Sequence, residues 1–250
     1  MNKLTIKLSF ILLFSFGVVS CSSNSKSPSE IYEGQSAEQI YSTGEIMLAK
    51  RSYKDAGQAF EALDSLYPFG TYTQQSQLNL IYAHYESEEL PSAEAAAERY
   101  IRLYPRSPNA DYAYYMKGVA NFEQDQSWIA RLLPFDLSAP RDHSLLEQAF
   151  IDFGDFVRLF PDSRYAPDAR QRMVYLRNVF AEREIHIARF YMEKKAYVAA
   201  ANRATHILRQ YSATPQAREA LKILVKANQA MGLKQSAQEA QQVLQLNTKA

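Results

Sequence analysis

Cys21 is the single cysteine of the 250-residue chain, and it lies between an apolar run that ends at Val19 and a serine-rich stretch that begins at Ser22. One cysteine cannot form a disulfide within its own chain, and a free thiol is a liability in an exported protein. The chemistry that suits a cysteine at such a boundary is acylation of its sulfur.

The residues before this cysteine predict a signal peptide over 1–20. A short start carries Lys3 and Lys7, and the apolar run Leu8–Val19 follows. The apolar part of a secretory signal has about 7 to 15 residues, whereas a membrane-spanning helix needs about 20. The motif Val18-Val19-Ser20-Cys21 resembles the bacterial lipobox, in which the cysteine is diacylated, becomes the new N-terminus and is then N-acylated. We therefore predict lipidation at Cys21.

Acylation would fix the chain to a membrane. A single acyl chain binds only marginally, at about 0.8 kcal/mol per buried methylene, so three chains would hold essentially permanently. An aspartate directly after the acylated cysteine tends to retain lipoproteins in the inner membrane. This chain has Ser22 at that position, and the absence of the aspartate indicates the periplasmic face of the outer membrane. Residues 21–36 are rich in serine after the cysteine, and we expect them to form the acylated cysteine and a flexible tether.

The other reactive side chains do not form a recognisable catalytic or metal-binding motif. The sequence contains none of the common metal, nucleophile or phosphate-binding motifs, so we predict a protein that is not an enzyme and needs no cofactor or metal. Glu182 and His186 are four residues apart, and two interpretations stay open for them, a shared metal or a surface ion pair. The 28 basic and 27 acidic side chains almost balance, which argues against nucleic acid as a partner.

The elements that would carry any binding surface are helices. Alanine-rich apolar periodicity with only eight glycines favours an all-α fold. Three predicted helices end at an aromatic residue followed by proline, at Pro68, Pro105 and Pro161, and a fourth ends at Tyr211-Ser212. Proline cannot continue a helix, so each segment is expected to be the second helix of a helix-turn-helix pair.

The first pair matches the 34-residue tetratricopeptide pattern, which places small residues where two helices cross closely. The characteristic positions fall on Gly44, Tyr53, Ala56, Phe60 and Tyr67. The same frame gives the later pairs these core residues: Ala93, Ala97, Tyr100 and Tyr104; Ala149, Phe153, Phe156 and Phe160; Tyr197, Ala200, Ala204 and Tyr211; and, in a weaker fifth pair, Leu221, Leu224, Ala227, Ala237, Ala240 and Leu244.

We therefore predict a tetratricopeptide-like solenoid of about five pairs over residues 37–250, with a concave surface. The spacing of the pairs becomes irregular after the second, which indicates two insertions. One is Gln124–Asp142, which contains Trp128 and either touches the membrane or packs against a neighbouring repeat. The other is a lengthened helical segment from about Pro167 to Glu193.

These segments resemble a known family. The stretch Glu61–Pro105, with Tyr67-Pro68-Phe69-Gly70 followed by Gln74-Gln75, is similar to the N-terminal repeats of the BamD family of lipoproteins, and Arg141–Ala169 is similar to its third helical pair. The resemblance implies a periplasmic scaffold of the outer-membrane β-barrel assembly machinery. Its partners would be a BamA-like barrel protein, other lipoproteins of the machinery and unfolded β-barrel substrates.

Within that resemblance, two surfaces are candidates for binding. Aromatic and amide side chains on the first two repeats offer flat apolar faces with polar tips to an extended substrate segment, or else several of them simply fill the core. They are Tyr67, Phe69, Tyr72, Gln75, Tyr82 and Tyr85. The pair Asn202-Arg203 resembles a docking site for the barrel partner, since arginine can bind a carboxylate through two hydrogen bonds; the alternative is an ordinary surface arginine.

Two functions from other classes stay open at this point. One is a periplasmic repeat lipoprotein that positions cell-wall enzymes. The other is an enzyme whose catalytic residues are dispersed along the sequence. A pull-down separates the first from an assembly scaffold, and an activity measured with an inhibitor panel would reveal the second.

Overall fold

The computed structural model describes residues 27–125 and 144–247, and in these ranges the chain forms helices and turns without a β-strand. The helices are α1 (Pro28–Ile31), α2 (Ala37–Ala49), α3 (Tyr53–Leu66), α4 (Thr73–Glu86), α5 (Leu90–Leu103), α6 (Ala110–Asp125), α8 (Ser144–Leu159), α9 (Ala166–Glu193), α10 (Tyr197–Gln210), α11 (Gln216–Ala230) and α12 (Lys234–Leu246). Within these ranges, no helix combines the length and the apolar character that crossing a bilayer requires.

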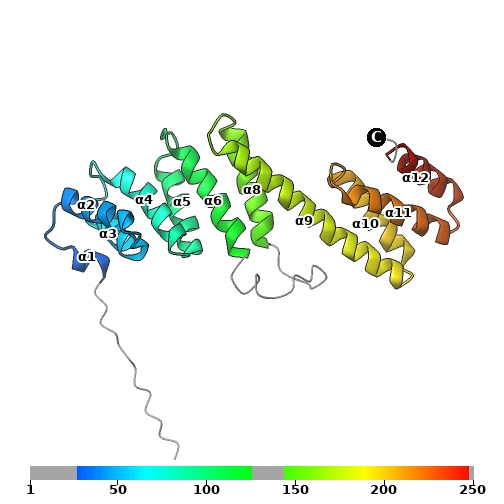
Figure 1. The fold of residues 1–250 in the computed structure, drawn as a ribbon, viewed down its shortest axis with the longest axis horizontal. Coiled ribbons are helices and arrows are strands. Elements are labelled where there is room, and N and C mark those ends of the chain that lie inside the picture. Colours follow the sequence, from blue (N-terminus) through cyan, green and yellow to red (C-terminus); the bar gives the residue numbers. More distant parts are fainter. Residues whose placement is uncertain (1–26, 126–143, 248–250) are drawn as a thin grey trace, which may run out of the picture.

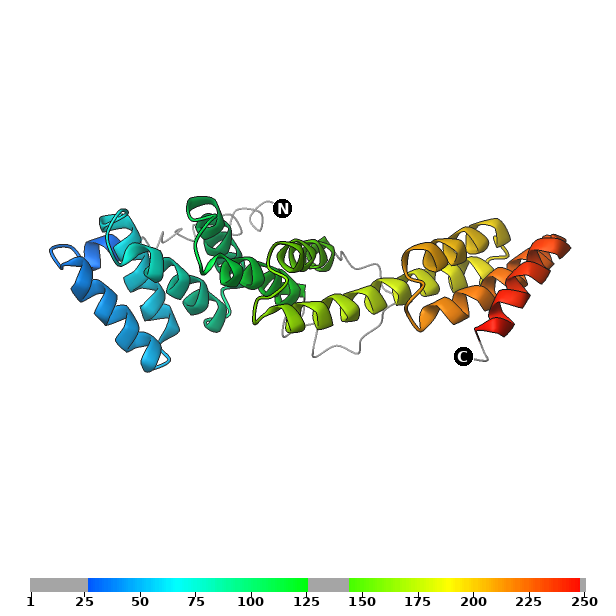
Figure 2. The ribbon, with the colours of Figure 1, turned by 90° about the horizontal axis from the view of Figure 1, so that it is seen from above.

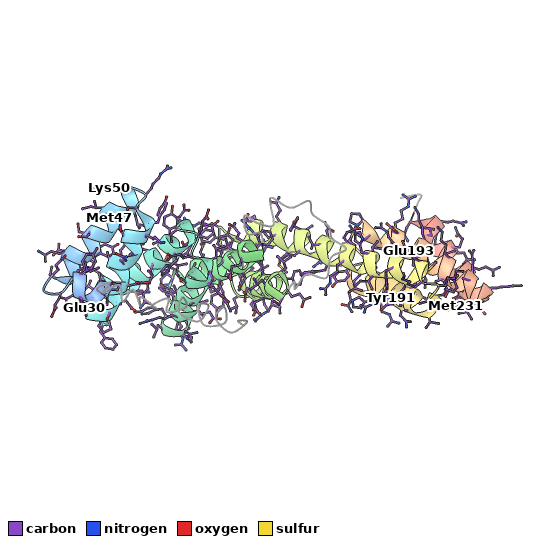
Figure 3. The ribbon with its side chains drawn as sticks, turned by 90° about the horizontal axis from the view of Figure 1, so that it is seen from below. Glu30, Met47, Lys50, Tyr191, Glu193 and Met231 are labelled. Atoms are coloured by element: carbon purple, nitrogen blue, oxygen red, sulfur yellow. The ribbon has the colours of Figure 1, made fainter. Side chains whose placement is uncertain are left out.

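The helices pack as five successive pairs, α2 with α3, α4 with α5, α6 with α8, α9 with α10, and α11 with α12. Each pair also contacts the next, and the result is an extended array with α1 and α12 at opposite ends (Figure 1). Side chains labelled in Figure 3 mark the two ends: Glu30, Met47 and Lys50 at one, and Tyr191, Glu193 and Met231 at the other. The predicted fold class, an all-α solenoid of about five repeats, is confirmed.

Two close contacts between paired helices fit the tetratricopeptide pattern. Gly44 of α2 faces Phe60 of α3, and a Cβ added to Gly44 would lie 2.5 Å from a ring carbon of Phe60. Gly118 of α6 faces Phe153 of α8 in the same way, at 2.8 Å. Both rings are fully buried, so only a residue without a side chain lets the two helices approach this closely.

Helix α9 belongs to two groups of helices at once. It runs from Ala166 to Glu193 with a proline in its first turn, which confirms the predicted long helix. Its first part, including Leu176, packs in the core formed with α6 and α8, whereas Ile185 and Ala188 pack in the core formed with α10 and α11. Figure 2 shows α9 passing from the N-terminal group to the C-terminal group. The other predicted insertion begins at Gln124 in the last turn of α6, and from residue 126 to 142 it is outside the described residues.

The start of the described chain differs from the expected tether. Ser27 caps α1, its backbone N–H donating to Glu30, and α1 packs against α3. Tyr32 packs on the core around Ile40, and the hydroxyl of Tyr67 donates to the backbone oxygen of Gln35 at 2.6 Å. The prediction of a flexible tether over 21–36 is therefore wrong for residues 28–36, because an aromatic side chain anchors them. The predicted signal peptide and Cys21 lie outside the described residues.

His84 connects the first two repeats. The ring of this α4 residue is almost fully buried, with Nε2 3.4 Å from Glu61 of α3 and Nδ1 3.1 Å from Glu89 at the start of α5. Burial alone would lower the pKa of His84, but hydrogen bonds to the two carboxylates and their charges outweigh it and raise the pKa above the ordinary value of 6.5. When the ring is protonated, it thus links three helices through two carboxylates.

This arrangement predicts a pH-dependent stability. Because the pKa of His84 is higher in the folded than in the unfolded chain, its contribution is complete below pH 6.5 and is lost as the pH rises through the folded-state pKa. We expect His84→Gln to lower the free energy of unfolding by about 1.5–3 kcal/mol at pH 5.5, because the substitution removes the charged hydrogen bonds of the protonated ring. The loss should be smaller at pH 9. Urea unfolding at several pH values measures this difference. A difference that grows with pH would contradict the assignment, and His206→Gln, an exposed histidine, is the control.

Candidate interaction surface

A groove of about 480 Å³ crosses the first helices of the repeats. Its walls come from α4, from the turn before α6 and the start of α6, and from the turn before α9. The lining residues are Gln75, Leu78, Asn79, Tyr82, Pro108, Asn109, Asp111, Tyr112, Arg164 and Tyr165. Three tyrosines and four amide or carboxylate side chains make this surface aromatic and polar at the same time.

Ring contacts hold the tyrosines of the groove in place. Tyr165 stacks on Tyr115 with ring centroids 4.7 Å apart and lies 5.8 Å from Tyr112. On the other wall, Tyr82 meets the ring of Tyr53 edge to face at 6.0 Å. Such pairs add about 0.5–1.5 kcal/mol each beyond buried area. The groove therefore presents a largely preformed set of rings.

The phenols of Tyr82 and Tyr112 are neutral hydrogen-bonding groups. Burial raises the pKa of Tyr112 well above its usual value, and burial together with the charge of Glu86 raises the pKa of Tyr82. A protonated phenol both donates and accepts hydrogen bonds, as does the side-chain amide of Asn109. Chemically, the surface suits an extended peptide, whose backbone supplies complementary donors and acceptors and whose apolar side chains lie against the rings.

Two of the six predicted substrate-binding residues line the groove. Gln75 and Tyr82 lie two turns apart on α4, where Gln75 donates to Asn79 at 3.0 Å and Tyr82 keeps 38% of its surface exposed. The sequence could place them together because residues seven apart on a helix share a face. Substrate binding by these residues stays a prediction.

The other four predicted residues are outside the groove lining. Tyr72 stacks on Tyr41 at 5.0 Å, Tyr67 is bound to the backbone before α2, and the hydroxyl of Tyr85 donates to Glu123. These three contacts lie within and between repeats and fit the alternative of a core role. Phe69 is completely exposed in the turn between α3 and α4.

Sequence reasoning missed Tyr112 and Tyr165, although the repeat frame held a signal for Tyr112. Tyr112 occupies the same place after Pro105 that Gln75 occupies after Pro68. Tyr165 stands in the same relation to Pro161 as Tyr72 does to Pro68. Projecting the first repeat onto the later ones would have pointed to Tyr112 but not to Tyr165, because Tyr72 itself lies outside the groove lining.

The C-terminal candidates lie on the second group of helices. Asn202 is exposed on α10, but Arg203 is not free, because its guanidinium donates to Glu184 of α9 at 3.0 Å. Nε2 of His186 lies 3.3 Å from a carboxylate oxygen of Glu182, a direct contact that fits the second of the two interpretations left open for them. Among the described residues, no group of three potential metal ligands is assembled.

Comparison with known proteins places the repeats in a family. A family model described as YfiO, outer membrane lipoprotein, matches residues 33–244. The chain is 39% identical to the outer membrane protein assembly factor BamD of Neisseria meningitidis serogroup A / serotype 4A over 87% of its own length and 81% of that protein. It is 37% identical to the BamD of Vibrio cholerae serotype O1, covering 84% and 86%, and 34% identical to that of Pasteurella multocida, covering 99% and 92%.

The match extends over all five helical pairs, from before α2 to near the end of α12. It includes the turn with Phe69 and the helix α4 that carries Gln75 and Tyr82. The chain therefore belongs to the YfiO family of outer membrane lipoproteins, the family of the BamD assembly factors.

Proposed function

We propose that this chain is a non-catalytic scaffold lipoprotein of the outer-membrane β-barrel assembly machinery, acting on the periplasmic face of the outer membrane. The observation that carries the proposal is the family match across the whole repeat array, with relatives named outer membrane protein assembly factor. An extended array with two separate groups of helices suits a scaffold, since each group offers its own surface.

A pull-down from detergent-solubilised outer membrane tests this function. We expect the tagged chain to recover a large β-barrel protein with periplasmic domains, together with further lipoproteins. Recovery of cell-wall enzymes in place of the barrel protein would overturn the proposal and favour the alternative, a lipoprotein that positions such enzymes.

The lipid anchor is proposed at Cys21, and residues 1–20 are proposed to be removed as a signal peptide. We expect Cys21→Ser to shift the protein from the outer-membrane fraction to the soluble periplasm, because the acyl chains hold it by burial of their methylenes. Ser23→Ala, two residues away, is the matched control and should fractionate like the parent chain. Mass spectrometry of the mature N-terminus provides the direct readout, and an unmodified cysteine would refute lipidation.

The groove is proposed to receive an extended segment of an unfolded barrel substrate. Its preformed tyrosines provide apolar faces for varied side chains, and its amides and phenols can bind the substrate backbone. Both features are needed by a site that accepts many sequences. Phe69 lies on the same half of the array and can contribute a further exposed ring.

This assignment makes a prediction for crosslinking. A photo-crosslinker at Gln75 should capture unfolded barrel substrate, and one at Gln238 on the exposed face of α12 should not. Adding Tyr82→Ala should lower the yield at Gln75 about two- to tenfold, since an aromatic contact contributes about 0.5–1.5 kcal/mol. Crosslinks confined to the C-terminal repeats would be incompatible with the groove as the substrate site.

The C-terminal group of helices is proposed to dock on a periplasmic domain of the barrel partner near Asn202 and Arg203. Arg203 retains 43% side-chain exposure beside Glu184, which it binds through one guanidinium nitrogen. Such a partly exposed arginine can add a partner carboxylate to the one that it already binds.

A further inference from the structure

A second pocket, of about 380 Å³, lies where α8, α9 and the end of α10 meet. Its apolar part is formed by Phe150 and Phe180, which meet edge to face at 6.0 Å, and by Ile151 and Tyr211. Ile151 is 55% exposed, so the rim of the pocket presents an aliphatic side chain to solvent. The pocket uses residues of both groups of helices, and it differs from the tyrosine groove in every lining residue.

The charges that line this pocket are paired with one exception. Arg183 lies 3.3 Å from Glu147, and Glu184 lies 3.0 Å from Arg203. Arg177 also lines the pocket, but no ion pair or hydrogen bond within the described part of the chain engages its guanidinium. The pocket therefore holds one uncommitted positive charge beside an apolar floor.

These features define what would complement the pocket. A carboxylate would supply the bidentate partner that a guanidinium fits best, and a large apolar side chain would cover the exposed rim and floor. A small free anion would leave Ile151 in water, whereas a polypeptide segment bears both groups and buries the rim as it docks. We propose that this pocket binds a segment of a partner protein that carries a glutamate or aspartate next to a large apolar residue, with Arg177 as the anchoring residue.

This inference rests on the proposed scaffold function and gives the C-terminal docking surface its chemistry. Glu184 joins the two features, because it lines the pocket and also binds Arg203. A partner carboxylate that approached Arg203 would have to share it with Glu184, while at Arg177 it would meet no internal competitor. Since α8 and α10 both contribute, a bound segment would also fix the angle between the two groups of helices.

Binding can be measured directly with two capped peptides, acetyl-Phe-Glu-Leu-amide and acetyl-Phe-Gln-Leu-amide, and the methyl NMR signal of Ile151. We expect the glutamate peptide to shift this signal saturably and the glutamine peptide to bind at least tenfold more weakly. Arg177→Gln should remove this preference, and Arg218→Gln, an exposed arginine of α11, should preserve it. Equal binding of the two peptides, or a preference unchanged in Arg177→Gln, would overturn the proposal.

Co-purification separates this inference from the scaffold function itself. If the parent chain and Arg218→Glu recover the barrel partner and Arg177→Glu recovers at least tenfold less, the pocket contributes to docking. Full recovery by Arg177→Glu overturns the pocket alone. Failure of the parent chain to recover any barrel partner instead counts against the scaffold function, and the peptide titration then still decides what the pocket binds. Circular dichroism of Arg177→Glu checks that its helices are intact.

Discussion

Replacing Lys117 by methionine is expected to lower the free energy of unfolding by about 3 kcal/mol, because it leaves a buried carboxylate without its cation. Lys117 of α6 lies 3.2 Å from Asp152 of α8 and 2.9 Å from Glu98 of α5. The Asp152 side chain is only 6% exposed and accepts further hydrogen bonds from Asn121 and Gln148. The network thus ties the second repeat to the third.

The pKa of Lys117 shows that the cation is held firmly. Burial alone would lower it, but the hydrogen bond to Glu98 and the charge of Asp152 raise it above its ordinary value. Lys117 therefore stays charged throughout the physiological range, and methionine, which is of similar length, removes the charge with little change in packing.

Thermal unfolding measures the effect, and a surface pair provides the control. Arg158 and Asp155 are 68% and 51% exposed, so Arg158→Met should cost at most about 1 kcal/mol. Adding Asp152→Asn to Lys117→Met should recover part of the loss, since a neutral amide is cheaper to bury than an unpaired carboxylate. Equal losses of unfolding free energy for Lys117→Met and Arg158→Met would show that the ion pairs of Lys117 contribute no more than an exposed pair does.

The fold was predictable because its determinants are local and repeated. Gly44 and Phe60 lie in one helix pair, and the steric relation between them recurs at Gly118 and Phe153. The packing of one helix pair therefore predicts the packing of a later pair. The expected tether failed for residues 28–36, where a few specific contacts fix the chain. Tyr32 packs on the first repeat and Tyr67 binds the backbone at Gln35, and average composition does not register such single aromatic contacts.

The candidate sites were only partly predictable because their contacts join distant helices. Gln75 and Tyr82 share one helix and were found together, whereas the rings of Tyr112 and Tyr165 reach the groove from later repeats. Helical periodicity assigns a residue to a face of its own helix, but it does not say which face of another helix lies opposite. For the same reason the sequence offered no hint that Glu184 binds Arg203.

That ion pair changes what Arg203→Ala is expected to do. The Glu184 side chain is only 14% exposed, so removing its partner leaves a mostly buried carboxylate. We expect Arg203→Ala to lower the free energy of unfolding by about 1–2 kcal/mol, in contrast to a purely surface-exposed docking residue. A loss of partner binding by this variant alone would therefore not separate docking from stability.

Substitutions at Glu184 separate the two roles. Glu184→Gln keeps the shape of the side chain and frees the guanidinium of Arg203, so docking through Arg203 should be retained or strengthened in co-purification of the barrel partner. Arg203→Ala combined with Glu184→Gln should recover stability, because no buried charge is left unpaired, yet recover at least tenfold less partner than Glu184→Gln alone. If the double variant regains both stability and partner binding, Arg203 is a structural residue and the docking contact lies elsewhere on the C-terminal helices.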